Sequence, residues 1–289
     1  MKNFNLILTI FVFSFQILIA ASSDPVFGEN GMIVSTSKQA SEVGIEILKK
    51  GGNAVDAAVA VGFALAVTSS SNGNIGGGGF MVAAMTDGET FTLDYREKAP
   101  AAAHRDLFLN ESGNVVPGMS LSSRAGSGVP GSVDGLIRAL VDHGSGNITL
   151  RQALAPAIRL AENGFELSHY EARRFNGYEG LFESNDAAAA IFIRKDNNPW
   201  KKGDKLVQKD LAKTLKRISK YGRDGFYTGP VADLIVAEMK RGNGLISLED
   251  LKNYSSVYRD PVSGTYNGHE VISMGPPSSG GALLVNMMN

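Results

Sequence analysis

The chain has 289 residues, a formal net charge of −1 and no cysteine. A chain of this length can bury a full hydrophobic core without cross-links, as one large domain or two small ones. The near-neutral charge argues against a nucleic-acid partner, because nucleic-acid-binding proteins carry a basic patch or stripe. The lack of cysteine excludes disulfides, thiolate metal sites and a cysteine nucleophile.

The N-terminus has the pattern of a secretory signal peptide. Lys2 precedes an apolar run over residues 6–20, and small residues follow the run. The run is shorter than the roughly 20 residues that a membrane-spanning helix needs. We therefore expect residues 1–21 to be a signal peptide and residues 22–289 to be exported, as a periplasmic or secreted protein with no stable membrane span.

Two helices are expected next. Apolar or small residues recur at helical spacing over residues 38–50, and Gly51 ends this amphipathic stripe. Asn53 stands at the N-cap position of a second helix over residues 54–67. The second helix is apolar on nearly every side, so it should be buried.

Four consecutive glycines occupy residues 76–79. They match neither a P-loop, which needs a terminal Lys-Ser/Thr, nor the GxGxxG dinucleotide fingerprint. No nucleotide or other cofactor is therefore expected. The glycines are expected instead to let one backbone segment approach another closely, or to reach positive φ.

Two strand-like segments follow the glycines, at residues 80–85 and 90–95. Between them, Asp87-Gly88 predicts a tight hairpin turn with both residues at positive φ. The two strand-like segments and the turn residues between them therefore predict a β-hairpin directly after the glycine run.

Arg96 follows the second of these strands. A rigid strand end could hold its guanidinium so that it meets a carboxylate with two parallel hydrogen bonds. The residue pattern alone favours a structural alternative, a salt bridge with Asp94, Glu97 or another surface acid.

Helices flank hairpins at both ends of the chain, which predicts one layered α/β (α+β) architecture rather than two unrelated modules. Residues 101–135 are rich in Gly, Ser and Pro and should form an ordered loop around a site, or a plain surface excursion. Further helices are expected at residues 149–162, 211–218, 230–239, 247–253 and after 281, and strands at 262–266 and 269–274, joined by Asn267-Gly268.

Other catalytic patterns are weak. The four histidines have no metal-ligand spacing, and no GxSxG elbow is present. Ser35 and Lys38 match SxxK, and residues 70–72 match SxN, as in serine penicillin-recognising enzymes, but the third element, Lys-Thr-Gly, is missing. No metal site and no serine nucleophile are therefore expected.

Longer blocks of sequence resemble the γ-glutamyltransferases, also called γ-glutamyl transpeptidases or glutathione hydrolases. The resemblance covers almost all of the mature chain. It implies an N-terminal nucleophile hydrolase with an αββα sandwich, made as a precursor that cleaves itself into a large and a small subunit. The blocks include GGNAVDAAVAVGFALAV (51–67), GNIGGGGFM (73–81), LDYREKAPAAAHRDLFL (93–109) and GVPGSVDGL (128–136).

The resemblance also implies a mechanism. The new N-terminal threonine of the small subunit attacks the γ-glutamyl carbonyl, with its own α-amino group as base. The glutamyl group then passes to water, an amino acid or a peptide. In this family the arginine of the REKAP-type block holds the α-carboxylate of the donor, and that position is Arg96.

No segment before Asn289 matches the threonine segment of the family. Residues 22–289 are therefore expected to be a large-subunit portion whose nucleophile and small-subunit half of the sheets lie beyond Asn289. Alone, this portion should be inactive and prone to aggregate through unpaired strand edges. The expected substrates are glutathione and other γ-glutamyl compounds, with an amino acid or dipeptide as acceptor, and the expected partner is the small subunit. The alternatives are a glutaryl or cephalosporin acylase of the same fold and a secreted, non-catalytic protein that binds γ-glutamyl ligands.

Overall fold

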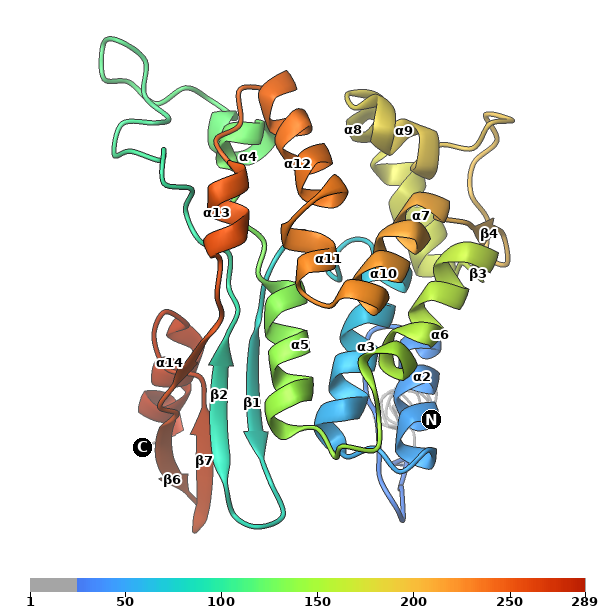
Figure 1. Cartoon of the computed structure of the whole chain (residues 1–289), viewed down its shortest axis with the longest axis vertical. Helices are drawn as coiled ribbons and strands as arrows, with labels where there is room; N and C mark the ends of the chain where they lie inside the picture. Colours follow the sequence, from blue (N-terminus) through green and yellow to red (C-terminus); the bar gives the residue numbers. More distant parts are fainter. Residues whose placement is uncertain (1–24, 289) are drawn as a thin grey trace, which may run out of the picture. The chain divides into compact units, whose positions relative to one another are not determined.

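The computed structural model describes residues 25–288, and the predicted signal peptide lies outside them. Residues 25–32 contain no helix or strand, and a second unit begins at residue 33. No helix in this described part of the chain is long and apolar enough to cross a bilayer. In chain order (Figure 1) the elements are α2 (Lys38–Lys49), α3 (Ala54–Thr68), β1 (Phe80–Ala84), β2 (Thr90–Asp94), α4 (Met119–Ser122), a 3₁₀ turn (Arg124–Gly126), α5 (Ser132–His143), α6 (Leu150–Asn163), β3 (Phe165–Glu166), α7 (His169–Gly177), α8 (Glu179–Glu183), α9 (Asp186–Phe192), β4 (Lys205–Leu206), α10 (Lys209–Tyr221), α11 (Asp224–Tyr227), α12 (Pro230–Arg241), α13 (Leu248–Asn253), β5 (Val257–Arg259), β6 (Val262–Tyr266), β7 (His269–Ser273) and α14 (Ser279–Met288).

Helix α3 is the centre of the hydrophobic core. It packs against α2, α5 and α6, which explains why it is apolar on nearly every side. Asn53 and Asp56 form its capping box: Asn53 Oδ1 accepts from the N–H of Asp56 at 2.9 Å, and Asp56 Oδ2 accepts from the N–H of Asn53 at 2.8 Å. The predictions for α2 and α3 are confirmed.

The main sheet has the strand order β1-β2-β5, with both pairs antiparallel. Phe80 pairs with Asp94, and Leu93 pairs with Tyr258. Helix α5 packs against β2, and α3 packs against α5, so helices cover the sheet (Figure 1). Strands β6 and β7 form a separate two-stranded antiparallel sheet, and α14 packs against it. This arrangement confirms the predicted layered α/β architecture.

The two predicted hairpin turns have different outcomes. Asn267 and Gly268 both have positive φ, 48° and 79°, so the two-residue turn between β6 and β7 is confirmed. The prediction that Asp87 also has positive φ is wrong, because only Gly88 does, at 91°. The N–H of Met85 donates to Glu89 O at 2.8 Å, which makes a three-residue loop closed by one left-handed glycine.

The expectation of a loop over residues 101–135 is only partly right. This stretch contains α4 and a 3₁₀ turn, and α5 begins within it at Ser132. The glycines at 131 and 135 obscured the start of α5, because glycine is unfavourable in helices by propensity. Short helices α7–α9 also carry no long periodic pattern, and sequence reasoning missed them.

Candidate functional site

The backbone of Arg96 is held at both of its polar atoms. Its N–H donates to Asp94 Oδ1 at 3.0 Å, and its carbonyl O accepts from the Tyr254 hydroxyl at 2.8 Å. Arg96 lies two residues beyond β2, so the strand and Tyr254 together fix where its side chain begins. The expected rigid placement of this residue is therefore present in the structure.

Glycines make this placement possible by removing side chains from the crowded backbone. A Cβ on Gly78 would lie 2.8 Å from Arg96 Cα and 2.5 Å from the carbonyl O of Tyr95. A Cβ on Gly131 would lie 2.0 Å from the same carbonyl O and 2.1 Å from the Tyr254 hydroxyl. The close-approach interpretation is confirmed for Gly78, whereas a Cβ on Gly76 would meet no heavy atom within 4 Å. No residue of 76–79 has the alternative positive φ.

The Arg96 side chain is exposed, and its guanidinium forms no salt bridge within residues 25–288. Asp94, the favoured structural partner, is instead paired with Arg259, whose Nε lies 2.7 Å from Asp94 Oδ2. The expectation of an Arg96–Asp94 or Arg96–Glu97 salt bridge is therefore wrong. Because Asp94 is paired with Arg259, the Arg96 guanidinium is left without an ion pair among the described residues.

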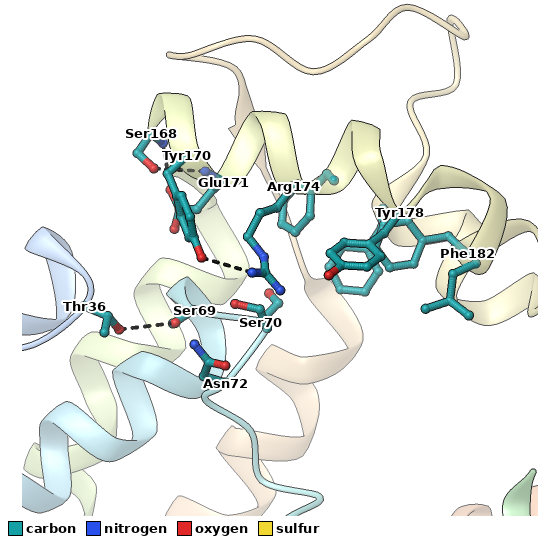
Figure 2. Close-up of a pocket in the computed structure, with 14 residues that line it drawn as sticks. Thr36, Ser69, Ser70, Asn72, Ser168, Tyr170, Glu171, Arg174, Tyr178 and Phe182 are labelled. Atoms are coloured by element: carbon teal, nitrogen blue, oxygen red, sulfur yellow. Dashed lines mark hydrogen bonds between the residues drawn. The ribbon is translucent and has the colours of Figure 1, made fainter. Parts of the chain in front are cut away.

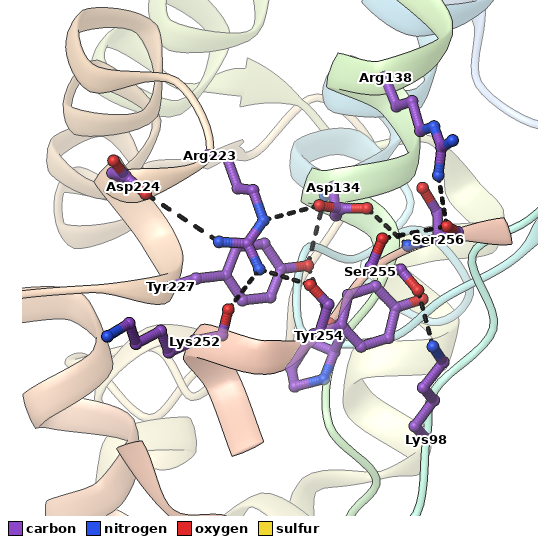
Figure 3. A network of polar contacts seen from close by, with 11 residues as sticks. Lys98, Asp134, Arg138, Arg223, Asp224, Tyr227, Lys252, Tyr254, Ser255 and Ser256 are labelled. Carbon is purple, nitrogen blue, oxygen red and sulfur yellow. Dashed lines mark hydrogen bonds and ion pairs between the residues drawn. The ribbon is translucent and has the colours of Figure 1, made fainter. Parts of the chain in front are cut away.

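Tyr254 belongs to a polar network that joins α5, α11 and the segment after α13 (Figure 3). At its centre is Asp134, which is 8% exposed. Its Oδ1 accepts from Arg223 Nε at 2.8 Å, and its Oδ2 accepts from the N–H of Ser256 at 2.7 Å. Arg223 also donates to the carbonyl oxygens of Lys252 and Tyr254. These hydrogen bonds fix the backbone at residues 252–254 and so the position of Tyr254.

Tyr254 connects this network to Arg96. Its ring is 3% exposed and stacks on Tyr227, with ring centroids 5.8 Å apart and an interplanar angle of 5°. Burial, reinforced by the charge of Asp134, raises the pKa of Tyr254. The hydroxyl therefore stays protonated at neutral pH and can keep donating to the Arg96 carbonyl.

The histidines and the SxxK pattern were the other candidates from sequence, and the side chains of His143, Ser35 and Lys38 make structural contacts. His143 stacks on Phe91 at a centroid distance of 3.8 Å, as expected for a packed histidine. Ser35 Oγ donates to Ser37 O at 2.8 Å, while Lys38 pairs with Glu42 at 3.7 Å. The SxxK pattern therefore does not bring a lysine onto the serine. Among the described residues, no group of three His, Cys, Asp or Glu side chains is arranged to hold a metal ion.

Tyr254, Asp134 and Arg223 were missed as candidates. They come from three distant parts of the chain, and no fixed spacing relates them. A larger cavity of about 560 Å³ was also missed, and Arg96 does not line it. A smaller cavity of about 300 Å³ is lined by Lys98 and Tyr254. Lys98 lies two positions after Arg96 in the chain, and Tyr254 donates to the Arg96 carbonyl.

A family model described as Gamma-glutamyltranspeptidase matches residues 40–289. Glutathione hydrolase proenzymes from Pseudomonas sp. (strain A14) and Escherichia coli (strain K12) are 48% and 46% identical, over 93% and 92% of this chain. These alignments cover 47% and 45% of the two relatives, so the chain spans about half the length of the curated relatives it matches.

Solved structures agree with the sequence comparison. The Helicobacter pylori gamma-glutamyltranspeptidase has a TM-score of 0.88 and 44% identity, over 92% of this chain and 75% of that chain. The Bacillus anthracis transpeptidase CapD has a TM-score of 0.74 and 34% identity, over 92% and 81% of the two chains. A Bacillus halodurans cephalosporin acylase has a TM-score of 0.71 at 24% identity, over 88% and 49% of the two chains, which supports the shared fold alone. The predicted N-terminal nucleophile hydrolase fold class is confirmed, and the chain belongs to the γ-glutamyltranspeptidase family.

Proposed function

We propose that the complete protein hydrolyses glutathione and other γ-glutamyl compounds and transfers the γ-glutamyl group to water, amino acids or dipeptides. In this proposal Arg96 binds the α-carboxylate of the γ-glutamyl donor. The observation that carries the assignment is an exposed guanidinium with no acidic partner among the described residues, on a backbone held at both N–H and C=O.

The geometry of Arg96 suits a carboxylate. A guanidinium presents paired N–H groups that match the two oxygens of a carboxylate, so one contact fixes both position and orientation of the ligand. Arg96 breaks no ion pair within the described chain when it binds, because Asp94 is already occupied by Arg259. The fixed backbone lowers the entropy lost when the complex forms.

Holding the α-carboxylate orients the distant γ-carbonyl of the donor. Restricting the donor in this way converts an encounter into a positioned reaction, which lowers the barrier for attack. The attacking group in this proposal is the N-terminal threonine of a small subunit made from the same precursor. It would come from the half of the family's proteins that these 289 residues do not match. Its hydroxyl loses a proton to its own α-amino group as the oxygen bonds to the γ-carbonyl carbon. The C–N bond of the γ-amide then breaks, and the amine leaves with that proton, which gives the acyl-enzyme.

We also propose that the protein is exported to the periplasm or the medium. The support is the signal-peptide pattern at residues 1–21. Mass measurement of the mature N-terminus in cell fractions tests this assignment, and a cytoplasmic protein that retains residue 1 would contradict it.

Turnover of matched anilides tests the function. We expect the complete protein to release arylamine from γ-glutamyl anilide faster than from glutaryl anilide, which lacks only the α-amino group. Preference for the glutaryl donor would instead identify an acylase of the same fold. Binding of γ-glutamyl ligands without any turnover would identify a non-catalytic binding protein.

A further inference from the structure

A cavity of about 560 Å³ lies between the segment after α3 and helices α7, α8 and α9 (Figure 2). Its volume is in the range of small-molecule sites. One wall is polar and comes from residues 69–72, and the other carries aromatic side chains from the three short helices. No residue of the Arg96 segment lines this cavity.

Arg174 supplies the positive charge of the cavity. It extends from α7 toward Ser70 (Figure 2), with its guanidinium 5.5 Å from the Tyr170 ring centroid and 5.2 Å from that of Tyr178. Its Nη1 donates to the Tyr170 hydroxyl at 3.0 Å. Within residues 25–288 it forms no salt bridge, and its Nε is buried without a hydrogen-bond partner.

Ser70, on the segment after α3, shows the same feature. Its Oγ is also buried and has no hydrogen-bond partner in the described chain. Buried polar groups are normally paired, because leaving them unpaired is unfavourable. Arg174 and Ser70 come from separate elements and both line this cavity, so their unpaired groups point to a polar ligand atom that both side chains contact.

The remaining wall is apolar. Phe182 and Phe192 stack with centroids 5.0 Å apart, and Phe175 lies 5.3 Å from Phe192. The other side chain in the lining that is charged at neutral pH is Glu171, whose Oε2 accepts from the N–H of Ser168 at 2.7 Å and caps α7. The cavity thus has one cationic, hydroxyl-bearing side and one aromatic side.

We propose that this cavity binds an apolar monocarboxylate, with the carboxylate on Arg174 and Ser70 and the hydrocarbon against the phenylalanines. A single guanidinium with one neighbouring hydroxyl matches a planar monoanion. A phosphate ester fits less well, because no lysine or second arginine lines the cavity and Glu171 opposes a second negative charge. This site is separate from the proposed γ-glutamyl site at Arg96 and does not depend on it.

The complete protein and two probes test this proposal. We expect isothermal titration to detect binding of 4-phenylbutyrate, and its neutral amide to bind about tenfold more weakly or worse, because the amide loses the charge-assisted hydrogen bond. Arg174→Gln should weaken 4-phenylbutyrate by about tenfold or more and remove the preference for acid over amide. The matched control is Arg173→Gln, since Arg173 is an exposed neighbour on the same helix and should change affinity less than about twofold.

Ser70→Ala separates loss of binding from loss of folding. This change removes an unpaired buried hydroxyl, so the melting temperature should stay the same or rise while 4-phenylbutyrate binds several-fold more weakly. No binding of 4-phenylbutyrate to the complete protein, equal binding of acid and amide, or equal effects of Arg173→Gln and Arg174→Gln would each overturn the proposal.

Discussion

Arg96 and Arg174 both lack a carboxylate partner among the described residues, yet different parts of the molecule hold them. Arg96 is positioned through its backbone, which lies against Gly78 and is bonded by Tyr254. Arg174 is positioned through its side chain, between the rings of Tyr170 and Tyr178. Backbone positioning requires glycines at neighbouring sites, whereas side-chain positioning requires only aromatic residues one helical turn away.

The largest expected effect concerns Asp134, which lies in the polar network of Tyr254 and not in the Arg174 cavity. Asp134→Ala should lower the free energy of unfolding by about 3 kcal/mol, because it leaves Arg223 and the N–H of Ser256 without their acceptor in a buried setting. Denaturant titration measures this loss. Asp224→Ala is the control: Asp224 is exposed and lies 4.0 Å from the same arginine, so its removal should cost under about 0.5 kcal/mol.

At a denaturant concentration where the variant is folded, Asp134→Ala should leave the affinity for 4-phenylbutyrate within about twofold of the unmutated chain. A tenfold loss of that affinity would show that the two regions are not independent.

The second prediction concerns the glycine run. Gly78→Ala should lower the free energy of unfolding by about 2 kcal/mol, because its Cβ would meet backbone atoms of Tyr95, Arg96 and Glu97 within 2.8 Å. Gly76→Ala places a Cβ where no heavy atom lies within 4 Å and should change stability by under about 0.5 kcal/mol. Equal effects in chemical denaturation would refute the close-approach account of these glycines.

The third prediction concerns the contact between Tyr254 and Arg96. Tyr254→Phe keeps the stacked ring but removes the donor to the Arg96 carbonyl, and should cost about 1 to 2 kcal/mol. In the complete protein we expect KM for γ-glutamyl donors to rise more than kcat falls, because Tyr254 positions Arg96 and does not touch the reacting carbonyl. An unchanged KM would mean that Arg96 keeps its place without this hydrogen bond.

The smallest prediction is a pH effect at Asp250. Burial raises the pKa of this carboxyl, but hydrogen bonds from Ser247 and the N–H of Ala101 outweigh burial and hold the pKa below its ordinary value. The contribution of Asp250 to the free energy of unfolding should therefore be present above about pH 3.9. It should be lost as the pH falls through the lower pKa of the folded state.

Asp250→Asn should remove this acid-side loss and cost about 0.5 kcal/mol at pH 7. Thermal unfolding at several pH values measures both effects. Glu249→Gln, an exposed neighbour, serves as the control, and a Glu249→Gln profile that matches that of Asp250→Asn would contradict the assignment.

Much of the Arg96 region could be predicted from sequence because local chemistry determines it. The glycine run predicted close backbone contact, which Gly78 makes, and the two strand-like segments after it predicted the hairpin. The prediction of positive φ at Asp87 was wrong, because a three-residue loop with one left-handed glycine connects two antiparallel strands as well as a two-residue turn with two positive-φ residues. The partner of Asp94 could not be predicted, since Arg259 lies 165 positions away along the chain.

The cavity around Arg174 could not be predicted from sequence for a related reason. Residues 69–72 and helices α7–α9 meet only in the folded chain, and each helix is too short to show a clear period. Tyr254 and Asp134 were missed in the same way, because the network that joins them depends on tertiary packing. Sequence signals were strong where backbone conformation restricts residue choice and weak where distant side chains converge.

The central claim is that Arg96 binds the donor's α-carboxylate, and one measurement tests it most directly. kcat/KM should be measured for γ-glutamyl anilide and 4-aminobutyryl anilide, which lacks only that carboxylate, with the complete protein and its Arg96→Gln variant. We expect the unmutated protein to prefer the γ-glutamyl donor by about 100-fold or more, and the variant to lose nearly all of this preference. If Arg96→Gln instead lowers kcat/KM for both anilides by the same factor, Arg96 does not recognise the α-carboxylate.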